Sequence, residues 1–242
     1  MKSTWVIAKR ELGAYFDSLI AYVLIILFLG LSGIFTWFFV RPIFLVNQAN
    51  LQFFFGFIAY WALFLFIPTI TMRVLAEEKK AGTIELLSTK AITDWEIVLG
   101  KFLSCLILIL ISLACTLPYY ITLSMLGDID HGAVLGGYFG LVLLSASYIS
   151  IGIFASSISN NQIVAILVAL LISILFHFIF DVISNSFRGT LGQVFNYLGF
   201  SSHYESLSRG VIDSRDIIYF GSIIFIGLLF AQAVLSKRNW KD

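Results

Sequence analysis

Reactive side chains are scarce in this chain, and the clearest pair is His177 and Asp181. The sequence holds 3 histidines, and His131 and His203 lie in more polar stretches than His177. A helix would place His177 and Asp181 one turn apart on the same face, where an imidazole and a carboxylate can handle protons. In the other interpretation, His177 lies near the end of a membrane span and only forms hydrogen bonds there. A single pair makes a poor proton relay, which favours this second interpretation.

The pair Gly100-Lys101 raises the question of nucleotide binding. A phosphate-binding P-loop needs a glycine five positions before this Gly-Lys pair and a hydroxyl residue directly after it. Trp95 and Phe102 occupy those two positions. We therefore expect that the chain does not bind ATP through this motif.

Two further patterns could suggest an enzyme or a metal site. Glu77-Glu78 resembles the paired glutamates of intramembrane prenyl-protein proteases, but Gly82 occupies the place of the arginine that completes that pattern. Cys105 and Cys115 lie in one apolar run without a metal-binding partner, so we interpret them as packing residues. We predict no catalytic residue, no metal site and no cofactor in the chain. An intramembrane enzyme acting on lipid or peptide remains an alternative.

The composition indicates an integral membrane protein. Hydrophobic residues make up 60% of the 242 residues and charged residues only 12%, which leaves too little polar surface for a water-soluble globule. The formal net charge of +1 provides no general attraction for nucleic acid, so membrane lipid is the expected surrounding.

The elements that must position any functional residue are six apolar segments. A helix needs about 20 apolar residues to cross the roughly 30 Å hydrocarbon core of a bilayer. The sequence predicts spans at residues 19–40, 51–72, 102–126, 133–158, 163–180 and 217–235. We expect an all-α, polytopic membrane protein in which residues 1–242 form a single transmembrane domain.

The distribution of basic residues predicts the orientation. Short loops rich in Lys and Arg stay in the cytoplasm. If both termini are cytoplasmic, 11 of the 15 Lys and Arg residues lie inside, and Arg41, Arg188, Arg209 and Arg215 lie outside. We expect both the N-terminus and the C-terminus on the cytoplasmic side.

Two segments beside the spans are expected to form helices. Residues 1–18 have apolar residues at helical spacing, which is typical of a helix in the inner interface; this helix includes Lys9, Arg10 and Glu11. Residues 181–216 form an outer capping segment, with short helices predicted at residues 191–198 and 203–209. Ser202 and Glu205 have capping-box spacing, and Gly210 is a plausible stop for the second helix.

A charged, amphipathic insert at residues 73–101 separates the second span from the third. Gly82 favours a turn, and residues 83–88 predict a short helix. Thr93 and Glu96 have capping-box spacing, so a new helix is expected to start at Thr93 and run into the third span. The resulting cytoplasmic hairpin is either an interfacial anchor with a solvated charged face or a docking element for a soluble partner.

Several motifs resemble those of ABC-2 type transporter permeases. They are Glu77-Glu78-Lys79, Gly82-Thr83-Ile84-Glu85-Leu86-Leu87, Ile97-Val98-Leu99-Gly100-Lys101, Lys9-Arg10-Glu11-Leu12, the turn at residues 156–162, His203-Tyr204 and Gly210-Val211-Ile212-Asp213. The chain is most similar to the short permeases of the gliding-motility and nitrous-oxide-accessory type. It departs from the family at Leu19 and Ala91, where members often have proline.

The resemblance implies a permease subunit that works with a separate cytoplasmic ABC ATPase, which would bind the ATP and Mg. It further implies a second permease copy, an outer auxiliary subunit as a possible partner, export as the direction, and a bacterial inner membrane. In the family the hairpin between the second and third spans is the coupling helix, here residues 82–88. The coupling residues carried over are Glu77, Glu78, Gly82, Thr83, Ile84, Glu85, Leu86, Leu87 and Ser88. An ATP-independent channel or scaffold remains an alternative.

Overall fold

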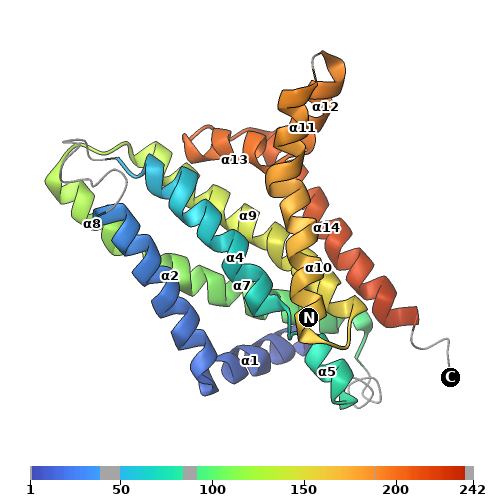
Figure 1. The fold of residues 1–242 in the computed structure, drawn as a ribbon. Helices are drawn as coiled ribbons and strands as arrows, with labels where there is room; N and C mark the ends of the chain where they lie inside the picture. Colours follow the sequence, from blue (N-terminus) through green and yellow to red (C-terminus); the bar gives the residue numbers. More distant parts are fainter. Residues whose placement is uncertain (1, 39–49, 84–91, 188, 238–242) are drawn as a thin grey trace.

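The computed structural model describes residues 2–38, 50–83, 92–187 and 189–237, and in these ranges the chain is helical without a β-strand. The elements in chain order are α1 (Lys2–Asp17), α2 (Leu19–Trp37), the π-helix η1 (Phe54–Ala59), α4 (Tyr60–Thr71), α5 (Ala76–Lys80), α7 (Asp94–Ala114), α8 (Leu117–Leu126), α9 (His131–Ile158), α10 (Gln162–Ile174), the π-helix η2 (Leu175–Ile179), α11 (Phe180–Ser186), α12 (Thr190–Leu198), α13 (Phe200–Ser208) and α14 (Ser214–Ser236). Figure 1 shows their arrangement.

The described residues contain six helical segments that are long and apolar enough to cross a membrane, which confirms the predicted all-α, polytopic fold. They are Leu19–Trp37, Phe54–Lys80, Asp94–Leu126, His131–Ile158, Gln162–Ser186 and Ser214–Ser236. The fifth segment ends at Ser186, six residues beyond the predicted end at Phe180, since α11 continues the helix through these residues.

Helix α9 is the centre of the bundle. It packs against α14, α10, α13, α4 and α7, and glycines on its faces let these neighbours approach closely. A Cβ atom on Gly140 would lie 3.0 Å from Leu207 Cβ of α13, and one on Gly152 would lie 2.0 Å from Thr71 Oγ1 of α4. The glycines of the predicted fourth span therefore serve helix packing.

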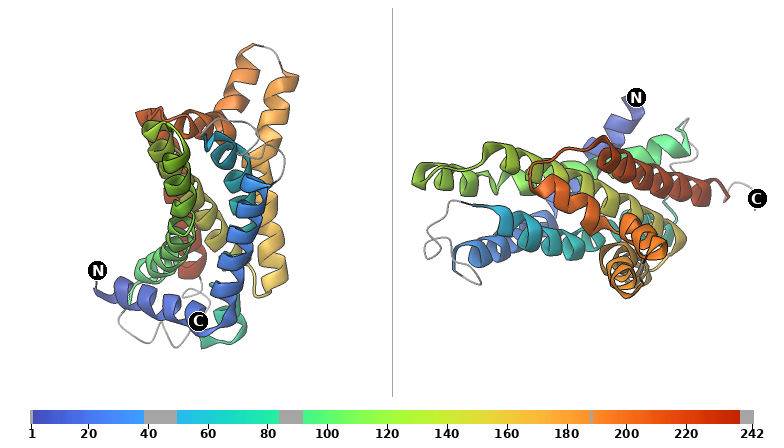
Figure 2. Two further views of the ribbon diagram at one scale, coloured as in Figure 1. Left: turned by 90° about the vertical axis from the view of Figure 1, so that its left-hand side faces the viewer. Right: turned by 90° about the horizontal axis from the view of Figure 1, so that it is seen from above.

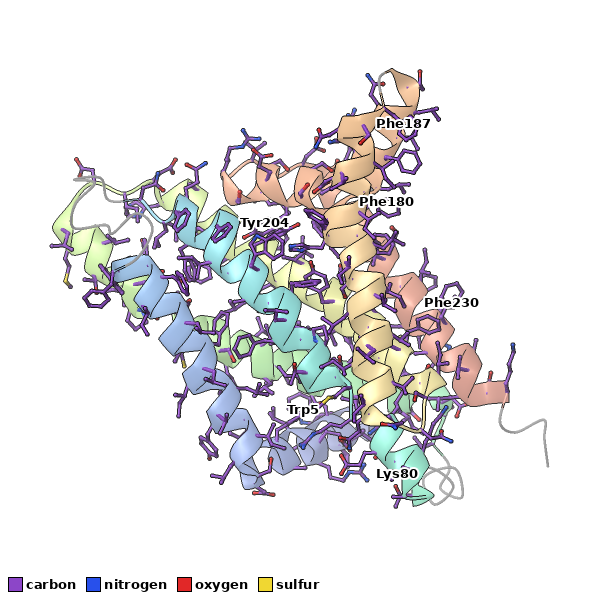
Figure 3. All side chains as sticks on the ribbon, viewed as in Figure 1. Trp5, Lys80, Phe180, Phe187, Tyr204 and Phe230 are labelled. Atoms are coloured by element: carbon purple, nitrogen blue, oxygen red, sulfur yellow. The ribbon has the colours of Figure 1, made fainter. Side chains whose placement is uncertain are left out.

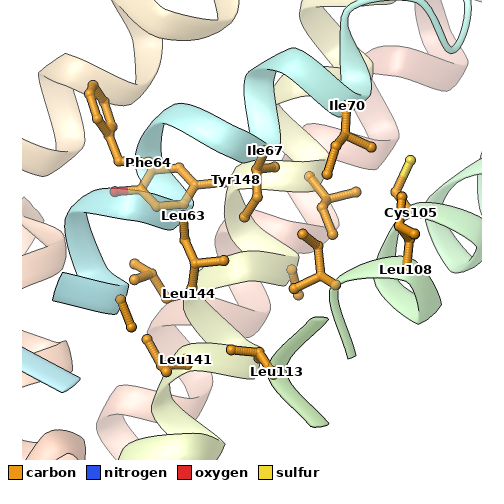
Figure 4. Packing of buried hydrophobic residues seen from close by; sticks show 14 of the residues in the cluster. Leu63, Phe64, Ile67, Ile70, Cys105, Leu108, Leu113, Leu141, Leu144 and Tyr148 are labelled. Atoms are coloured by element: carbon orange, nitrogen blue, oxygen red, sulfur yellow. The ribbon is translucent and has the colours of Figure 1, made fainter. Parts of the chain in front are cut away.

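The interior between α4, α7 and α9 is filled by apolar side chains (Figure 4). Those labelled there are Leu63, Phe64, Ile67, Ile70, Cys105, Leu108, Leu113, Leu141, Leu144 and Tyr148. By contrast, α2 and α10 leave most of their apolar surface exposed, as expected for helices that face lipid or another membrane subunit. Cys115, interpreted as a packing residue from the sequence, is exposed where α7 ends.

Helix α1 lies across one end of the bundle (Figures 1 and 2). It packs on α7, where a Cβ atom on Gly100 would lie 2.7 Å from Ile7 Cγ2. Helix α14 finishes at this same end, which we call the α1 end. The short α13 lies across the opposite end, which we call the α13 end, and the α11–α12 hairpin projects beyond it.

One predicted helix start at the α13 end is wrong. The helix begins at Phe200 with Gly199 as its N-cap, so Ser202 lies inside the first turn and does not form a capping box with Glu205. Ser202 Oγ instead donates a hydrogen bond to the Asn196 carbonyl, 2.7 Å away. The helix starts earlier because its first residue, Phe200, is fully buried and anchors the first turn in the bundle. The predicted helix at residues 191–198 is confirmed as α12, and Gly210, at φ 86°, follows the end of α13.

Candidate functional site

The charged insert leaves the bundle at the α1 end through a break in the second span. Helix α4 ends at Thr71, residues 72–75 form turns, and α5 begins at Ala76. Gly82 then adopts φ 68°, in the left-handed region that glycine enters without a steric penalty. The chain thus turns where the sequence placed a turn. Figure 3 shows Lys80 at the α1 end, close to where the described part of the insert ends at Thr83.

Four charged side chains from three elements meet beside this break. Lys101 Nζ of α7 lies 2.9 Å from Glu78 Oε2 of α5 and 3.6 Å from Glu11 Oε2 of α1. Arg10 of α1 lies 2.5 Å from Glu11 Oε1 and 3.2 Å from Glu78 Oε1. The two acids and two bases balance in charge, and we call these four residues the charge cluster.

Lys101 is the most enclosed member of the charge cluster. Its side chain is 0% exposed, whereas those of Glu11 and Glu78 are 18% and 17% exposed and that of Arg10 is 54% exposed. Lys101 Nζ also donates a hydrogen bond of 2.7 Å to the Val74 carbonyl in the break. Its contact with Glu78 is a close ion pair rather than an aligned hydrogen bond. A buried ammonium needs such partners because an unpaired buried charge is costly.

The electrostatics of Arg10 follow from the same cluster. The pKa of its guanidinium is raised, chiefly because Arg10 donates a hydrogen bond to Glu11, while partial burial acts in the opposite direction. Glu78 contributes a weaker attraction of the same sign as Glu11. Arg10 therefore keeps its charge and ties α1 to α5.

Tyr15 forms a second attachment between α1 and the second span. Its hydroxyl donates a hydrogen bond of 3.1 Å to the Ile70 carbonyl, and the Arg73 guanidinium lies 5.1 Å from the centre of its ring. Burial raises the pKa of Tyr15 well above its usual value, so the hydroxyl stays neutral. Helix α1 is thus fixed to the last turn of α4 as well as to α5 and α7.

The end of α9 holds the break from the other side. Ser156 Oγ accepts hydrogen bonds from the backbone N–H groups of Leu75 and Ala76 and donates one to the Met72 carbonyl, each 3.0 Å long. Lys79 Nζ donates a hydrogen bond to the Ser157 carbonyl. The base of the insert is therefore attached to the fourth span as well as to α1 and α7.

The return of the insert into the bundle follows the sequence prediction. Thr93 is the N-cap of α7; its side chain accepts a hydrogen bond from the Glu96 N–H, and the Glu96 carboxylate accepts one from the Thr93 N–H. This reciprocal capping box satisfies two backbone donors at the helix start. Helix α7 then carries Lys101, eight residues after Thr93, to the charge cluster.

The structure describes part of the predicted coupling set. Glu77, Gly82 and Thr83 are exposed, and Glu78 is half-buried in the charge cluster. The residues of the predicted tip, Ile84, Glu85, Leu86, Leu87 and Ser88, lie outside the described residues. On the predicted interfacial helix, Lys9 and Arg10 are exposed, whereas Glu11 is half-buried.

Sequence reasoning missed Lys101 and Ser156 as members of this site. Lys101 carried one available signal, since it is the only charge between Glu96 and Asp128 and would need a partner wherever the helix is enclosed. Ser156 carried none, because it is one of several serines on the fourth span and its hydroxyl bonds to residues about 80 positions away.

His177 and Asp181 do not form the proton-handling pair that their spacing allowed. His177 lies in η2, with its ring stacked 4.2 Å from that of Tyr60 and 4.7 Å from that of Phe64, and its Nδ1 is 2.5 Å from the Tyr148 hydroxyl. Asp181 instead accepts a hydrogen bond of 2.5 Å from Ser201. The hydrogen-bonded, structural interpretation of His177 is the one that the structure supports.

The described residues contain no group of three or more His, Cys, Asp and Glu side chains placed to hold a metal ion. In a comparison with protein families, residues 41–236 match the model described as ABC-2 family transporter protein. The matched region begins after α2 and runs to the last residue of α14. No curated protein matches the chain significantly.

Proposed function

Because the chain belongs to the ABC-2 family of transporter proteins, and is thereby a permease subunit of an ABC transporter, we propose that its cytoplasmic hairpin couples ATP hydrolysis by a separate ATPase to movement of cargo. The hairpin is the insert between the second and third spans. Its base is α5, and its proposed contact with the ATPase is at residues 82–88.

The attachment of α5 to three other elements is the observation that carries this proposal. The charge cluster joins α5 to α1 and α7, and Ser156 with Ser157 joins the same segment to α9. A loop that only connects two spans would need none of these contacts. A segment that transmits force needs attachments of this kind, because coupling between distant sites is carried by networks of packed side chains, hydrogen bonds and ion pairs.

The proposed mechanism is a movement of the hairpin as one body. When ATP closes the ATPase dimer, the tip would be displaced, and the charge cluster would carry α1 and the start of α7 with it. The fourth span would move through the hydrogen bond from Lys79 to the Ser157 carbonyl, and as α9 it contacts most of the bundle. The exposed acidic residue Glu77 would help to orient the hairpin on the ATPase, as charges at the rim of an interface do.

Further features of the proposal extend the family resemblance. The working unit would contain two copies of this permease, homologous to the gliding-motility type, with two ATPase subunits that bind ATP and Mg. It would export cargo across a bacterial inner membrane, with both termini in the cytoplasm and an outer auxiliary subunit as an additional partner. The basic residues of α1 and α5, all at the α1 end, support this orientation by the positive-inside rule.

Co-purification tests the proposal. The tagged permease would be extracted from its native membranes in mild detergent, and an ABC ATPase in the eluate would be identified by mass spectrometry and measured by ATP hydrolysis. Gly82→Pro would be compared with wild type, because proline fixes φ near −65° and cannot adopt the φ of 68° at this turn. Arg209→Gln, an exposed change at the α13 end, is the matched control.

We expect wild type and Arg209→Gln to retain the ATPase, and Gly82→Pro to insert in the membrane but to lose it. Absence of an ATPase with wild type would overturn the proposal and favour an ATP-independent channel or scaffold. Retention of the ATPase by Gly82→Pro would show that the hairpin is not the docking element.

A further inference from the structure

The break between α4 and α5 has a specific cause in the hydrogen-bond ladder. In a continuous helix, the Ala76 N–H would donate to the Met72 carbonyl and the Leu75 N–H to the Thr71 carbonyl. Here the Ser156 hydroxyl lies between Ala76 and Met72, accepting from the first and donating to the second, and it also accepts from Leu75. The Thr71 carbonyl accepts from the Val74 N–H instead, at 3.2 Å. A side chain inserted in the ladder is a recognised cause of a helix kink.

The hydroxyl of Ser156 is completely used by this insertion. A serine hydroxyl has one donor and two acceptor positions, and the three contacts to the break fill all of them. The side chain is 0% exposed, so water does not compete for these bonds. Gly152, one turn earlier on α9, makes the approach possible, since a Cβ atom there would lie 2.0 Å from Thr71 Oγ1.

The break also has a contact on its other side. The Val74 carbonyl, which lies within the turns, accepts the hydrogen bond from Lys101 Nζ of α7. The break is therefore held by α9 through Ser156 and by α7 through Lys101. We call residues 72–76 the joint.

We propose that Ser156 is a positioning residue that keeps the joint open and thereby sets the angle between the second span and the hairpin. When Ser156 withdraws, the Ala76 N–H bonds directly to the Met72 carbonyl and the Leu75 N–H to the Thr71 carbonyl. The freed hydroxyl donates to the Gly152 carbonyl of its own helix, as buried helical serines commonly do. The Met72 and Thr71 carbonyls, the Leu75 and Ala76 N–H groups and the Ser156 hydroxyl thus keep hydrogen-bond partners in both arrangements, so leaving them unpaired does not oppose the change. The use of this joint in coupling rests on the proposed function, whereas the role of Ser156 in setting the angle at the joint is independent of it.

The first experiment measures the joint in the permease alone. Spin labels at Leu65 of α4 and Lys80 of α5, both exposed, report the angle across the joint by pulsed electron paramagnetic resonance in lipid nanodiscs, after Cys115→Ser. A continuous helix would separate the two Cα atoms by about 22 Å, since each residue adds 1.5 Å. We expect Ser156→Ala to move the distance distribution toward that value.

Two variants control this experiment. Ser157→Ala removes the neighbouring hydroxyl, which donates only to the Phe154 carbonyl of its own helix, and should leave the distribution unchanged. Ser156→Thr keeps the hydroxyl and should retain the wild-type distance. If Ser156→Ala is not recovered as folded protein, Ser156→Gly also removes the hydroxyl and serves the same comparison. An unchanged distribution in Ser156→Ala or Ser156→Gly, or an equal shift in Ser157→Ala, overturns the proposal.

The second experiment uses the same labels in the complex with the ATPase. We expect ATP to shift the wild-type distance toward the closed ladder, and Ser156→Ala to show the closed distance with and without ATP. If no ATPase binds wild type, the proposed function fails, but the first experiment still tests whether Ser156 sets the angle at the joint. If the ATPase binds and ATP leaves the wild-type distance unchanged, the joint has no part in coupling.

Discussion

Replacing Lys101 with methionine removes the best-enclosed charge of the charge cluster. Glu11 and Glu78 would then share Arg10 as their remaining basic partner in the cluster, and the Val74 carbonyl would lose a hydrogen bond of 2.7 Å. Loss of one partner from a buried ion pair costs roughly 3–5 kcal/mol. Because the two glutamates keep 17–18% of their side-chain exposure, we expect the lower limit, about 3 kcal/mol of unfolding free energy.

Thermal unfolding of the purified permease in lipid nanodiscs measures this effect. For a chain of this size, 1 kcal/mol corresponds to a change in Tm of about 2–4 °C, so Lys101→Met should lower Tm by about 6–12 °C. Arg10→Gln is the control within the same cluster. Its side chain is 54% exposed, and an exposed ion pair contributes about 0–1 kcal/mol, so Tm should fall by less than about 4 °C.

A double-mutant cycle separates the ion pair from general damage to packing. Glu78→Gln removes the negative charge while keeping the shape of the side chain. The double variant, Lys101→Met with Glu78→Gln, removes both charges of the pair, so neither is left without its partner. We expect the double variant to be more stable than the sum of the single effects predicts, by about 1–3 kcal/mol. If Lys101→Met lowers Tm no more than Arg10→Gln does, or if the two single effects simply add, the charge cluster does not hold α5 as described.

Three further changes test other contacts by the same unfolding measurement. Gly152→Ala would place a Cβ atom 2.0 Å from Thr71 Oγ1, so the helices must separate, and we expect a loss of about 1–3 kcal/mol; an unchanged Tm would contradict the close packing of α4 on α9. Thr93→Ala removes the cap of α7 and should cost about 1 kcal/mol, whereas Thr93→Ser should be nearly neutral. Tyr148→Phe leaves His177 Nδ1 buried without its 2.5 Å partner, which should cost about 1–3 kcal/mol, and a smaller effect would indicate that water replaces the hydroxyl.

Features set by local chemistry could be predicted from the sequence. The six spans follow from runs of apolar residues long enough to cross a bilayer, and their positions agree with the helices to within a few residues in most cases. Thr93 was identified as a cap because a threonine followed three residues later by Glu96 satisfies the helix start without help from elsewhere. The same reasoning failed at Ser202, where burial of Phe200 moved the start of the helix earlier.

Features that depend on contacts between distant elements could not be predicted. The sequence shows that Lys101 would be costly to bury, but not that Glu11 and Glu78 surround it, because these residues come from separate helices. The role of Ser156 depends on the angle at which α9 meets the end of α4, which no spacing of residues encodes. The likeness to a permease family drew attention to the hairpin at residues 73–101, but the contacts that hold its base depend on the three-dimensional arrangement of α1, α5, α7 and α9.

The two π-helical segments have a consequence for how this chain tolerates insertions and deletions. Each π turn contains about one residue more than an α turn, so a π segment absorbs an extra residue that would otherwise rotate everything after it by about 100° around the helix axis. In η2, this extra residue lies where α10 continues into α11. Deleting one residue from Leu175–Ile179 would therefore restore an ordinary helix and largely keep the direction of α11 and α12, whereas deleting one residue from α10 would rotate them by more than a quarter turn. The segments η1 and η2 are thus places where a one-residue change in chain length is absorbed locally.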